Sequence, residues 1–203
     1  MNVNSAQFHK SSPNFSQCPP ELMPEYAFIG RSNVGKSSLI NKLVNKTKLA
    51  KTSSTPGKTQ LINHFLINDN WYLVDLPGYG FARMPAKEKK KMEEMISTYL
   101  LNRKNLMNIF VLIDSRHEPL DIDLIFMQEL AENQLPFAIV FTKADKNRKR
   151  GLEERIKKYK TALLQSWEEL PPMFVSSSET GIGTDEILKY IDQINPLFEP
   201  ITP

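Results

Sequence analysis

One stretch limits the possible folds of this chain more than any other: residues 30–37 read GRSNVGKS. They fit G-x-x-x-x-G-K-[ST], a loop that binds phosphate between a strand and a helix. A short apolar run ends at Ile29, and apolar residues at helical spacing begin at Leu39. Inward-facing backbone N–H groups and the positive end of the helix would hold the anion. The predicted phosphate-binding residues are Gly30, Arg31, Ser32, Asn33, Val34, Gly35, Lys36 and Ser37.

Two side chains of this loop have separate predicted roles. Lys36 would reach the β- and γ-phosphates, and the Ser37 hydroxyl would bind Mg²⁺. The loop therefore predicts a nucleotide site, without saying which base it takes.

The rest of the chain alternates short apolar runs with longer amphipathic stretches. We expect strands at 25–29, 61–67, 71–76, 107–114, 137–142 and 173–176, and helices at 36–44, 86–101, 121–132, 152–167 and 184–194. This order predicts an α/β fold: a mostly parallel sheet with helices on both faces.

Composition narrows the class of protein further. The 203 residues, 40% of them hydrophobic, suit one globular domain. The longest apolar runs have five residues, so we expect no membrane partner, and the polar first 20 residues favour a cytoplasmic location. We expect residues 1–20 to form a flexible arm and residues 196–203 a tail. The single cysteine, Cys18, excludes an internal disulfide.

A second motif, Asp75-Leu76-Pro77-Gly78, ends the apolar run that begins at Trp71. An acidic residue there can hold Mg²⁺ through a water, and the glycine lets a backbone N–H approach the γ-phosphate. Taken alone, the same four residues also fit a common turn. Their position after the phosphate-binding loop favours the nucleotide role.

Two further segments indicate the base. Thr142-Lys143-Ala144-Asp145 follows a predicted strand. The Asp145 carboxylate can accept the paired N–H donors on N1 and N2 of guanine, which adenine does not offer. The Lys143 stem can cover the base or the ribose. Val175, Ser176 and Ser177 end the last predicted strand, where backbone N–H groups could contact a guanine oxygen.

Together, GRSNVGKSSLIN, TSSTPGKTQ, DLPGYGFA, TKAD and SSSETGIG resemble the EngB (YihA-type) family of bacterial GTPases. The resemblance implies a three-layer, Ras-like P-loop domain over residues 21–195. Its sheet would be mostly parallel and six-stranded, with one antiparallel edge strand. The family hydrolyses GTP to GDP and phosphate, which implies a switch in binding to the large ribosomal subunit precursor and its rRNA. It also implies a role in cell division and septation.

The resemblance also assigns a first switch, and its residues are Gly57, Lys58, Thr59, Gln60 and Leu61. Thr59 would join Ser37 on Mg²⁺ when GTP is bound. Ras-like enzymes carry a water-orienting Gln directly after the D-x-x-G glycine, but this chain has Tyr79. We therefore assign no catalytic residue. Our hypothesis is slow hydrolysis, raised by a partner or by a monovalent cation such as K⁺ near Asn33.

Two basic runs, KEKKK at 87–91 and KNRKR at 146–150, motivate a surface that faces rRNA. The alternative for each run is a solvated helix start or loop. A second class of function also stays open: a GTP-dependent RNA-binding module in which hydrolysis is very slow and the binding state alone matters. We see no coiled-coil heptad and expect a monomer, with a GTP-bound dimer as the alternative.

Overall fold

The computed structural model describes residues 1–50, 60–80 and 84–200. Its strands are β1 (Ala6–Ser12), β2 (Glu25–Gly30), β3 (Ile62–Ile67), β4 (Trp71–Asp75), β5 (Leu106–Asp114), β6 (Phe137–Thr142) and β7 (Met173–Val175). Its helices are α1 (Lys36–Leu43), α2 (Ala86–Asn102), α3 (Asp121–Glu132), α4 (Lys149–Leu163) and α5 (Thr184–Ile194), with short 3-10 turns η1 (Phe15–Gln17), η2 (Ala144–Lys146) and η3 (Asn195–Leu197). The strands form one sheet in the order β1-β3-β4-β2-β5-β6-β7.

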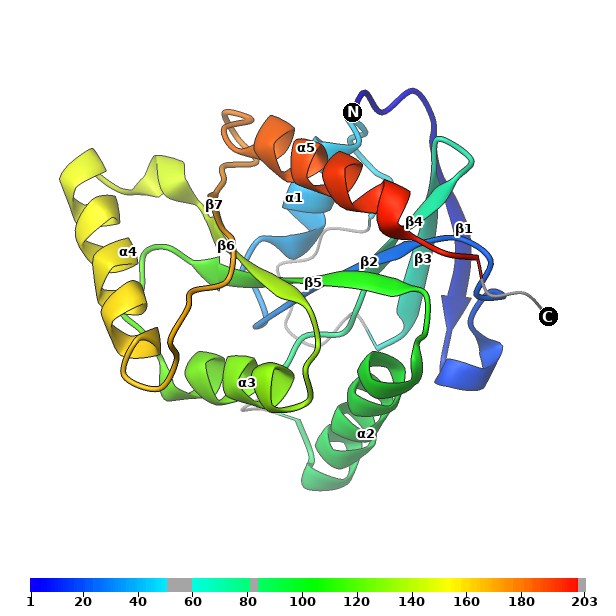
Figure 1. Cartoon of the computed structure of the whole chain (residues 1–203), viewed down its shortest axis with the longest axis horizontal. Helices are drawn as coiled ribbons and strands as arrows, with labels where there is room; N and C mark the ends of the chain where they lie inside the picture. Colours follow the sequence, from blue (N-terminus) through cyan, green and yellow to red (C-terminus); the bar gives the residue numbers. More distant parts are fainter. Residues whose placement is uncertain (51–59, 81–83, 201–203) are drawn as a thin grey trace.

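The sheet lies between two layers of helices (Figure 1). Helices α1 and α5 cover one face, and α2, α3 and α4 cover the other. In β2, Ala27 and Ile29 belong to the core under α2 and α3, whereas Tyr26 and Phe28 belong to the core under α1 and α5. All four are fully buried, because a parallel strand between two helix layers has no solvent-facing side. The predicted α/β class, with helices on both faces, is confirmed.

The sheet has seven strands rather than the six expected, because β1 comes from the segment predicted to be a flexible arm. β1 pairs antiparallel with β3, which is itself antiparallel to β4. β3 is therefore the strand that runs against the others, as expected, but β1 rather than β3 forms the edge of the sheet. Residues 6–12 read AQFHKSS, and most of their side chains are exposed or half-buried. Strong apolar alternation is therefore missing from this strand, and the sequence pattern did not reveal it.

Two element boundaries also differ from expectation. Helix α4 begins at Lys149 rather than at 152 and ends at Leu163 rather than at 167, so it takes in the end of the second basic run. At the carboxyl end of the chain, the expected tail begins within η3. The Tyr26 hydroxyl donates a hydrogen bond to Asn195 Oδ1 at 2.7 Å, which ties this turn to the sheet.

The described part of the chain contains no helix that is both long and apolar enough to cross a membrane.

Candidate phosphate- and base-binding site

The predicted motifs follow the carboxyl ends of neighbouring strands. The phosphate-binding loop follows β2, Asp75 ends β4, and Thr142 ends β6. These strands run parallel, with β4 next to β2 and only β5 between β2 and β6. Their carboxyl ends therefore share one edge of the sheet, which is where open α/β sheets bind ligands.

The loop after β2 is curled so that it leads directly into α1. Asn33 and Gly35 adopt left-handed conformations, with φ of 63° and 101°, and Gly35 caps the amino end of α1. A side chain at Gly30 would place its Cβ 2.7 Å from the Leu112 carbonyl oxygen. Buried Val34 anchors the loop in the core beneath it. The result is a backbone ring above a helix amino terminus, an arrangement that attracts anions.

Asp75 and Lys36 form a buried ion pair at the mouth of this loop. Lys36 lies in the first turn of α1 and Asp75 at the end of β4, so the pair joins the first two predicted motifs. Gly78 lies directly against the loop, since a Cβ there would be 2.5 Å from the Gly30 carbonyl oxygen. The segment Asp75–Gly78 thus packs beneath the loop rather than turning away from it.

The Thr142–Asp145 segment is bonded to the same loop. The Thr142 hydroxyl donates to the Val34 carbonyl oxygen at 2.6 Å. The Lys143 ammonium donates to the Asn33 carbonyl oxygen at 2.6 Å, from a residue that is itself in the left-handed conformation. The segment predicted to select the base is therefore held at a fixed place beside the predicted phosphate-binding loop.

Asp145 is connected to the third predicted segment. The Ser177 hydroxyl donates to Asp145 Oδ1 at 2.7 Å, and the Ala144 N–H donates to the Ser176 carbonyl oxygen at 3.1 Å. The hydrogen bond from Ser177 lowers the pKa of Asp145, so the carboxylate is charged at neutral pH and able to accept N–H donors. Val175 ends β7 and lies against Gly183. A Cβ at Gly183 would be 1.9 Å from the Val175 carbonyl oxygen, so no side chain fits at that glycine.

The structure describes only part of the segment predicted to be the first switch. Gly57, Lys58 and Thr59 lie outside the described residues. Gln60 and Leu61 are exposed just before β3. The residue pairing of β3 with β4 sets Asn63 opposite Asp75, so β3 begins next to the end of β4.

Sequence reasoning missed Asp114, which ends β5, the strand between β2 and β6. It accepts hydrogen bonds from Lys143 Nζ at 2.9 Å and from the Arg116 guanidinium at 2.7 Å. Burial would raise its pKa, but these bonds outweigh burial and hold the pKa of this carboxyl below its usual range. Asp114 thereby fixes Lys143. The available signal was an acidic residue ending a buried strand, the pattern that revealed Asp75.

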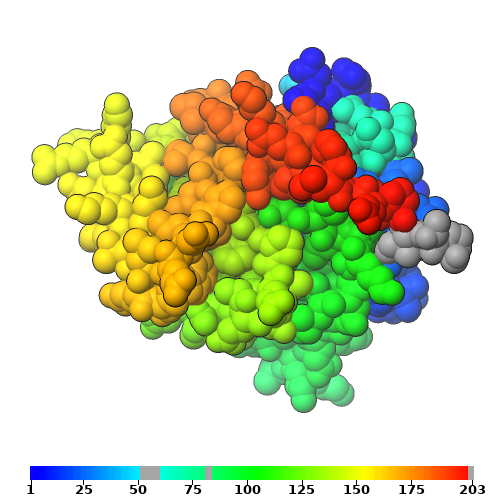
Figure 2. All heavy atoms as spheres, viewed as in Figure 1, coloured from blue at the N-terminus to red at the C-terminus, as the bar shows by residue number. Residues whose placement is uncertain are grey.

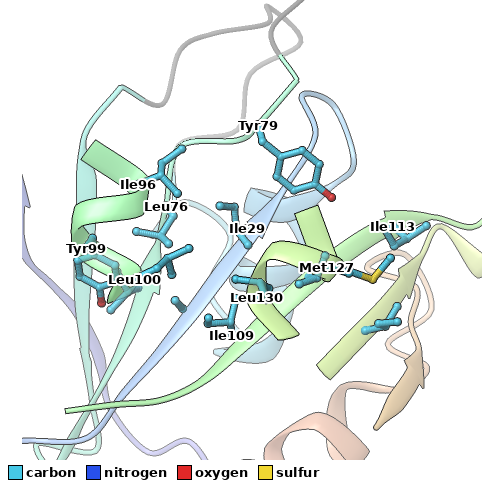
Figure 3. Packing of buried hydrophobic residues seen from close by; sticks show 14 of the residues in the cluster. Ile29, Leu76, Tyr79, Ile96, Tyr99, Leu100, Ile109, Ile113, Met127 and Leu130 are labelled. Carbon is cyan, nitrogen blue, oxygen red and sulfur yellow. The ribbon is translucent and has the colours of Figure 1, made fainter. Parts of the chain in front are cut away.

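Tyr79, in the place where Ras-like enzymes carry Gln, points into the protein rather than along the loop. Its ring stacks on Phe126, with centroids 4.3 Å apart, and its hydroxyl donates to Asp123 Oδ1 at 2.9 Å. Figure 3 shows it at the rim of the core cluster that includes Ile29 and Met127. In this position the Tyr79 hydroxyl is bonded to α3.

Comparison with known families gives a match to the model described as 50S ribosome-binding GTPase, over residues 25–143. That range runs from β2 through Lys143 and includes the loop, Asp75–Gly78 and Tyr79. It covers more than half of the chain.

Relatives of nearly the same length are also found. The probable GTP-binding protein EngB of Porphyromonas gingivalis is 57% identical over 195 residues, which are 96% of this chain and 97% of that protein. The protein of the same name from Phocaeicola vulgatus is also 57% identical, over 96% of this chain and 98% of its own length.

Solved structures share the fold at lower identity. The crystal structure of a probable GTP-binding protein engB has a TM-score of 0.69 and 23% identity, covering 86% of this chain and 100% of that one. Aquifex aeolicus Era bound to GDP and aluminium fluoride has a TM-score of 0.70 and 23% identity, covering 89% and 60%. At such identities the likeness shows the fold alone.

Proposed function

The chain belongs to the EngB family of GTP-binding proteins and is a GTPase, and from this premise we propose that bound GTP switches its binding to the precursor of the large ribosomal subunit. The observation that carries the proposal is the convergence of three motifs, beginning at Gly30, Asp75 and Thr142, at one edge of the sheet. The description of the matched family as ribosome-binding supports the partner. The protein would act in the cytoplasm during subunit assembly, on which normal cell division and septation depend.

Each part of the site has one role in this proposal. Backbone N–H groups of Gly30–Ser37 hold the phosphates, and Lys36 exchanges its contact with Asp75 for the β- and γ-phosphates. The Asp145 carboxylate accepts the N1 and N2 donors of guanine. Residues 175–177 support the base, and Ser177 also holds Asp145 in place.

The donor set suits Mg²⁺, which prefers hard oxygen ligands. The Ser37 hydroxyl lies in the first turn of α1, and Asp75 supplies a buried carboxylate beside Lys36. We propose Ser37 and Thr59 as direct ligands, with Asp75 acting through a water. The ion would neutralise charge between the phosphates.

Hydrolysis is proposed to be slow in the isolated protein, because the Tyr79 hydroxyl is occupied by Asp123. A monovalent cation beside Asn33, or the ribosomal partner, would then raise the rate. Single-turnover rates in K⁺ and in Na⁺ at equal ionic strength test this. A rate that is already fast alone and equal in the two salts would contradict it. The buried Tyr79 also favours the second candidate, an RNA-binding module in which the nucleotide state matters and hydrolysis hardly does.

The basic surface most suited to rRNA is the start of α4. Arg148, Lys149 and Arg150 are all exposed, and Figure 2 shows this part of α4 projecting from the body of the protein. In the other run, Lys89 and Lys90 lie within 4 Å of Glu93 and Glu94. Their positive charge is partly neutralised within α2, as Asp145 and Glu154 partly neutralise Lys146 and Arg150. Only the first run also contains an acidic residue, Glu88, so the second run has the higher net charge and the stronger attraction to phosphate.

Co-sedimentation with immature large-subunit particles tests the proposal. With a non-hydrolysable GTP analogue, we expect binding that GDP does not support. Replacing Arg148, Lys149 and Arg150 by Glu should abolish most of it. The matched control replaces Lys87, Lys90 and Lys91 by Glu, an equal change of charge. Equal binding by the wild type and the α4 variant at low salt would refute the α4 surface.

The base assignment is tested in the same assay with Asp145→Asn. The amide presents a donor where guanine also has one, so the GTP analogue should no longer support particle binding. A xanthosine analogue should restore it. If the variant still responds to the GTP analogue at wild-type concentrations, Asp145 does not select the base.

A further inference from the structure

Three residues from three separate segments meet at a single oxygen atom beside the nucleotide site. Asp123 Oδ1, in the first turn of α3, accepts a hydrogen bond from the Tyr79 hydroxyl at 2.9 Å and another from Arg31 Nε at 3.0 Å. Arg31 is the second residue of the phosphate-binding loop, and Tyr79 directly follows Gly78. This Arg31–Asp123–Tyr79 bridge therefore connects the loop to the D-x-x-G segment through α3.

The carboxylate of the bridge is buried and only half satisfied. Asp123 has no exposed surface, and its second oxygen, Oδ2, has no hydrogen-bond partner within the described residues. A buried charge with an open acceptor destabilises a fold relative to an apolar side chain of similar size. Packing alone therefore gives no reason for a carboxylate here, whereas a role in holding Arg31 and Tyr79 does.

The bridge lies next to the contact between Gly78 and the phosphate-binding loop. Gly78 lies so close to the Gly30 carbonyl that no side chain would fit between them. The bridge fixes the residue after each of these glycines. A backbone N–H at Gly78 can reach a γ-phosphate only while the segment stays at this distance from the loop.

We propose that Tyr79 and Arg31 are positioning residues for the γ-phosphate: held by Asp123, they keep the Gly78 N–H against the phosphate-binding loop. The inference rests on the proposed nucleotide site but not on the ribosomal partner. GDP has no γ-phosphate, so the bridge affects GTP and leaves GDP almost untouched. A residue that only fills the core would act on both nucleotides alike or on neither.

The test is Tyr79→Phe, which keeps the ring stacked on Phe126 and removes only the hydroxyl. We measure the affinities of a non-hydrolysable GTP analogue and of GDP by fluorescence titration with Mg²⁺. The analogue should bind about tenfold more weakly, within the usual range of coupling between sites, while GDP affinity stays within about twofold. The matched control is Tyr26→Phe, which removes another buried hydroxyl bond, to Asn195, on the opposite face of the sheet. It should change neither affinity.

Arg31→Gln provides an independent arm, because it removes the charge but leaves the loop backbone in place. It should also weaken the analogue selectively. If both residues act through Asp123, the double variant should lose much less than the product of the two single losses. Equal losses for both nucleotides, no loss for either, or fully multiplicative effects would each overturn the proposal. Because the readout contains no ribosomal particle, a failure of particle binding leaves this result unaffected.

Discussion

Strand β2 has a buried carboxylate cluster near each end, and the two clusters share three kinds of side chain. At the amino end the Glu25 cluster consists of Glu25, Tyr99 and Arg103, with His64 Nε2 also 3.3 Å from Glu25 Oε1. At the carboxyl end the Asp123 cluster consists of Asp123, Arg31 and Tyr79. Both carboxylates are completely buried. The clusters differ in how the carboxylate oxygens are used.

In the Glu25 cluster both oxygens are bonded. Arg103 donates from Nε to Oε2 at 2.9 Å and from Nη2 to Oε1 at 2.5 Å, and the Tyr99 hydroxyl donates to Oε2 at 2.5 Å. Arg103 also donates to the Pro19 carbonyl at 2.7 Å. Burial alone would raise the pKa of Glu25, but Arg103 and the neighbouring His64 outweigh it and lower the pKa to about 2.

In the Asp123 cluster a single oxygen accepts both donors, and burial raises the pKa of the carboxyl group. The same residue types thus give a fixed clamp at one end of β2 and an incompletely bonded contact at the other. A saturated cluster resists rearrangement because every bond lost must be replaced. The Asp123 cluster has one carboxylate oxygen without a partner within the described residues, so fewer bonds hold it at the end of the strand where we propose that nucleotide binds.

The largest expected effect is on the clamp. Arg103→Gln leaves the buried Glu25 carboxylate without its counter-charge, and we expect the free energy of unfolding to fall by about 3–5 kcal/mol. Urea unfolding followed by circular dichroism measures it. The control, Arg150→Gln, removes an exposed arginine paired with Glu154 and should change stability by no more than about 0.5 kcal/mol. A similarly small loss of unfolding free energy in both variants would mean that Arg103 does not stabilise the Glu25 cluster.

The second effect is a dependence on pH. The pKa of Glu25 is about 2 in the folded protein against 4.5 ordinarily, so its stabilisation is present above pH 4.5 and lost as pH falls towards 2. Ionised Glu25 contributes roughly 3 kcal/mol to the free energy of unfolding, and about 2 kcal/mol of this contribution should be lost between pH 6 and pH 3. The gap in stability between wild type and Glu25→Gln should shrink by that amount in urea titrations. A gap that is constant across this range would show that Glu25 titrates normally.

The smallest effect belongs to the other cluster. The raised pKa of Asp123 means that its contribution to stability falls as pH rises above the ordinary value of 3.8, the opposite sign to Glu25. Asp123→Asn removes the charge, so we expect stability at pH 7 to stay within about 1 kcal/mol of the wild type. The same urea experiment measures it. A loss as large as that of Arg103→Gln would erase the distinction between the two clusters.

The parts of the site that the sequence predicted are local. Each lies within a few residues of a strand end, where a short motif carries its own backbone requirements, as the two left-handed residues Asn33 and Gly35 do. The order of strands and helices was likewise readable from apolar runs such as 109–113. Roles at Thr59 stay predictions, because that residue is outside the part of the chain that the structure describes.

The parts that were missed depend on pairings across long stretches of chain. Asp123 looks like an ordinary acidic residue in the first turn of a helix, and only the fold brings it to Tyr79, 44 residues away. Glu25 and Arg103 are 78 residues apart and belong to an apparently apolar strand and a helix end. The spacing of residues in a single sequence does not predict such pairs, because they depend on how the helices pack on the sheet.

Strand β1 has a consequence for handling the protein. It covers the edge of β3, whose first and last residues, Ile62 and Ile67, are fully buried. β1 itself forms the edge of the sheet, and it carries Lys10 and other polar residues, which discourage pairing with a neighbouring sheet. A shortened version that begins after Ser12 would leave the β3 backbone open to a second molecule. Such a preparation should aggregate on concentration, so expression tags are better placed where they leave residues 6–12 intact.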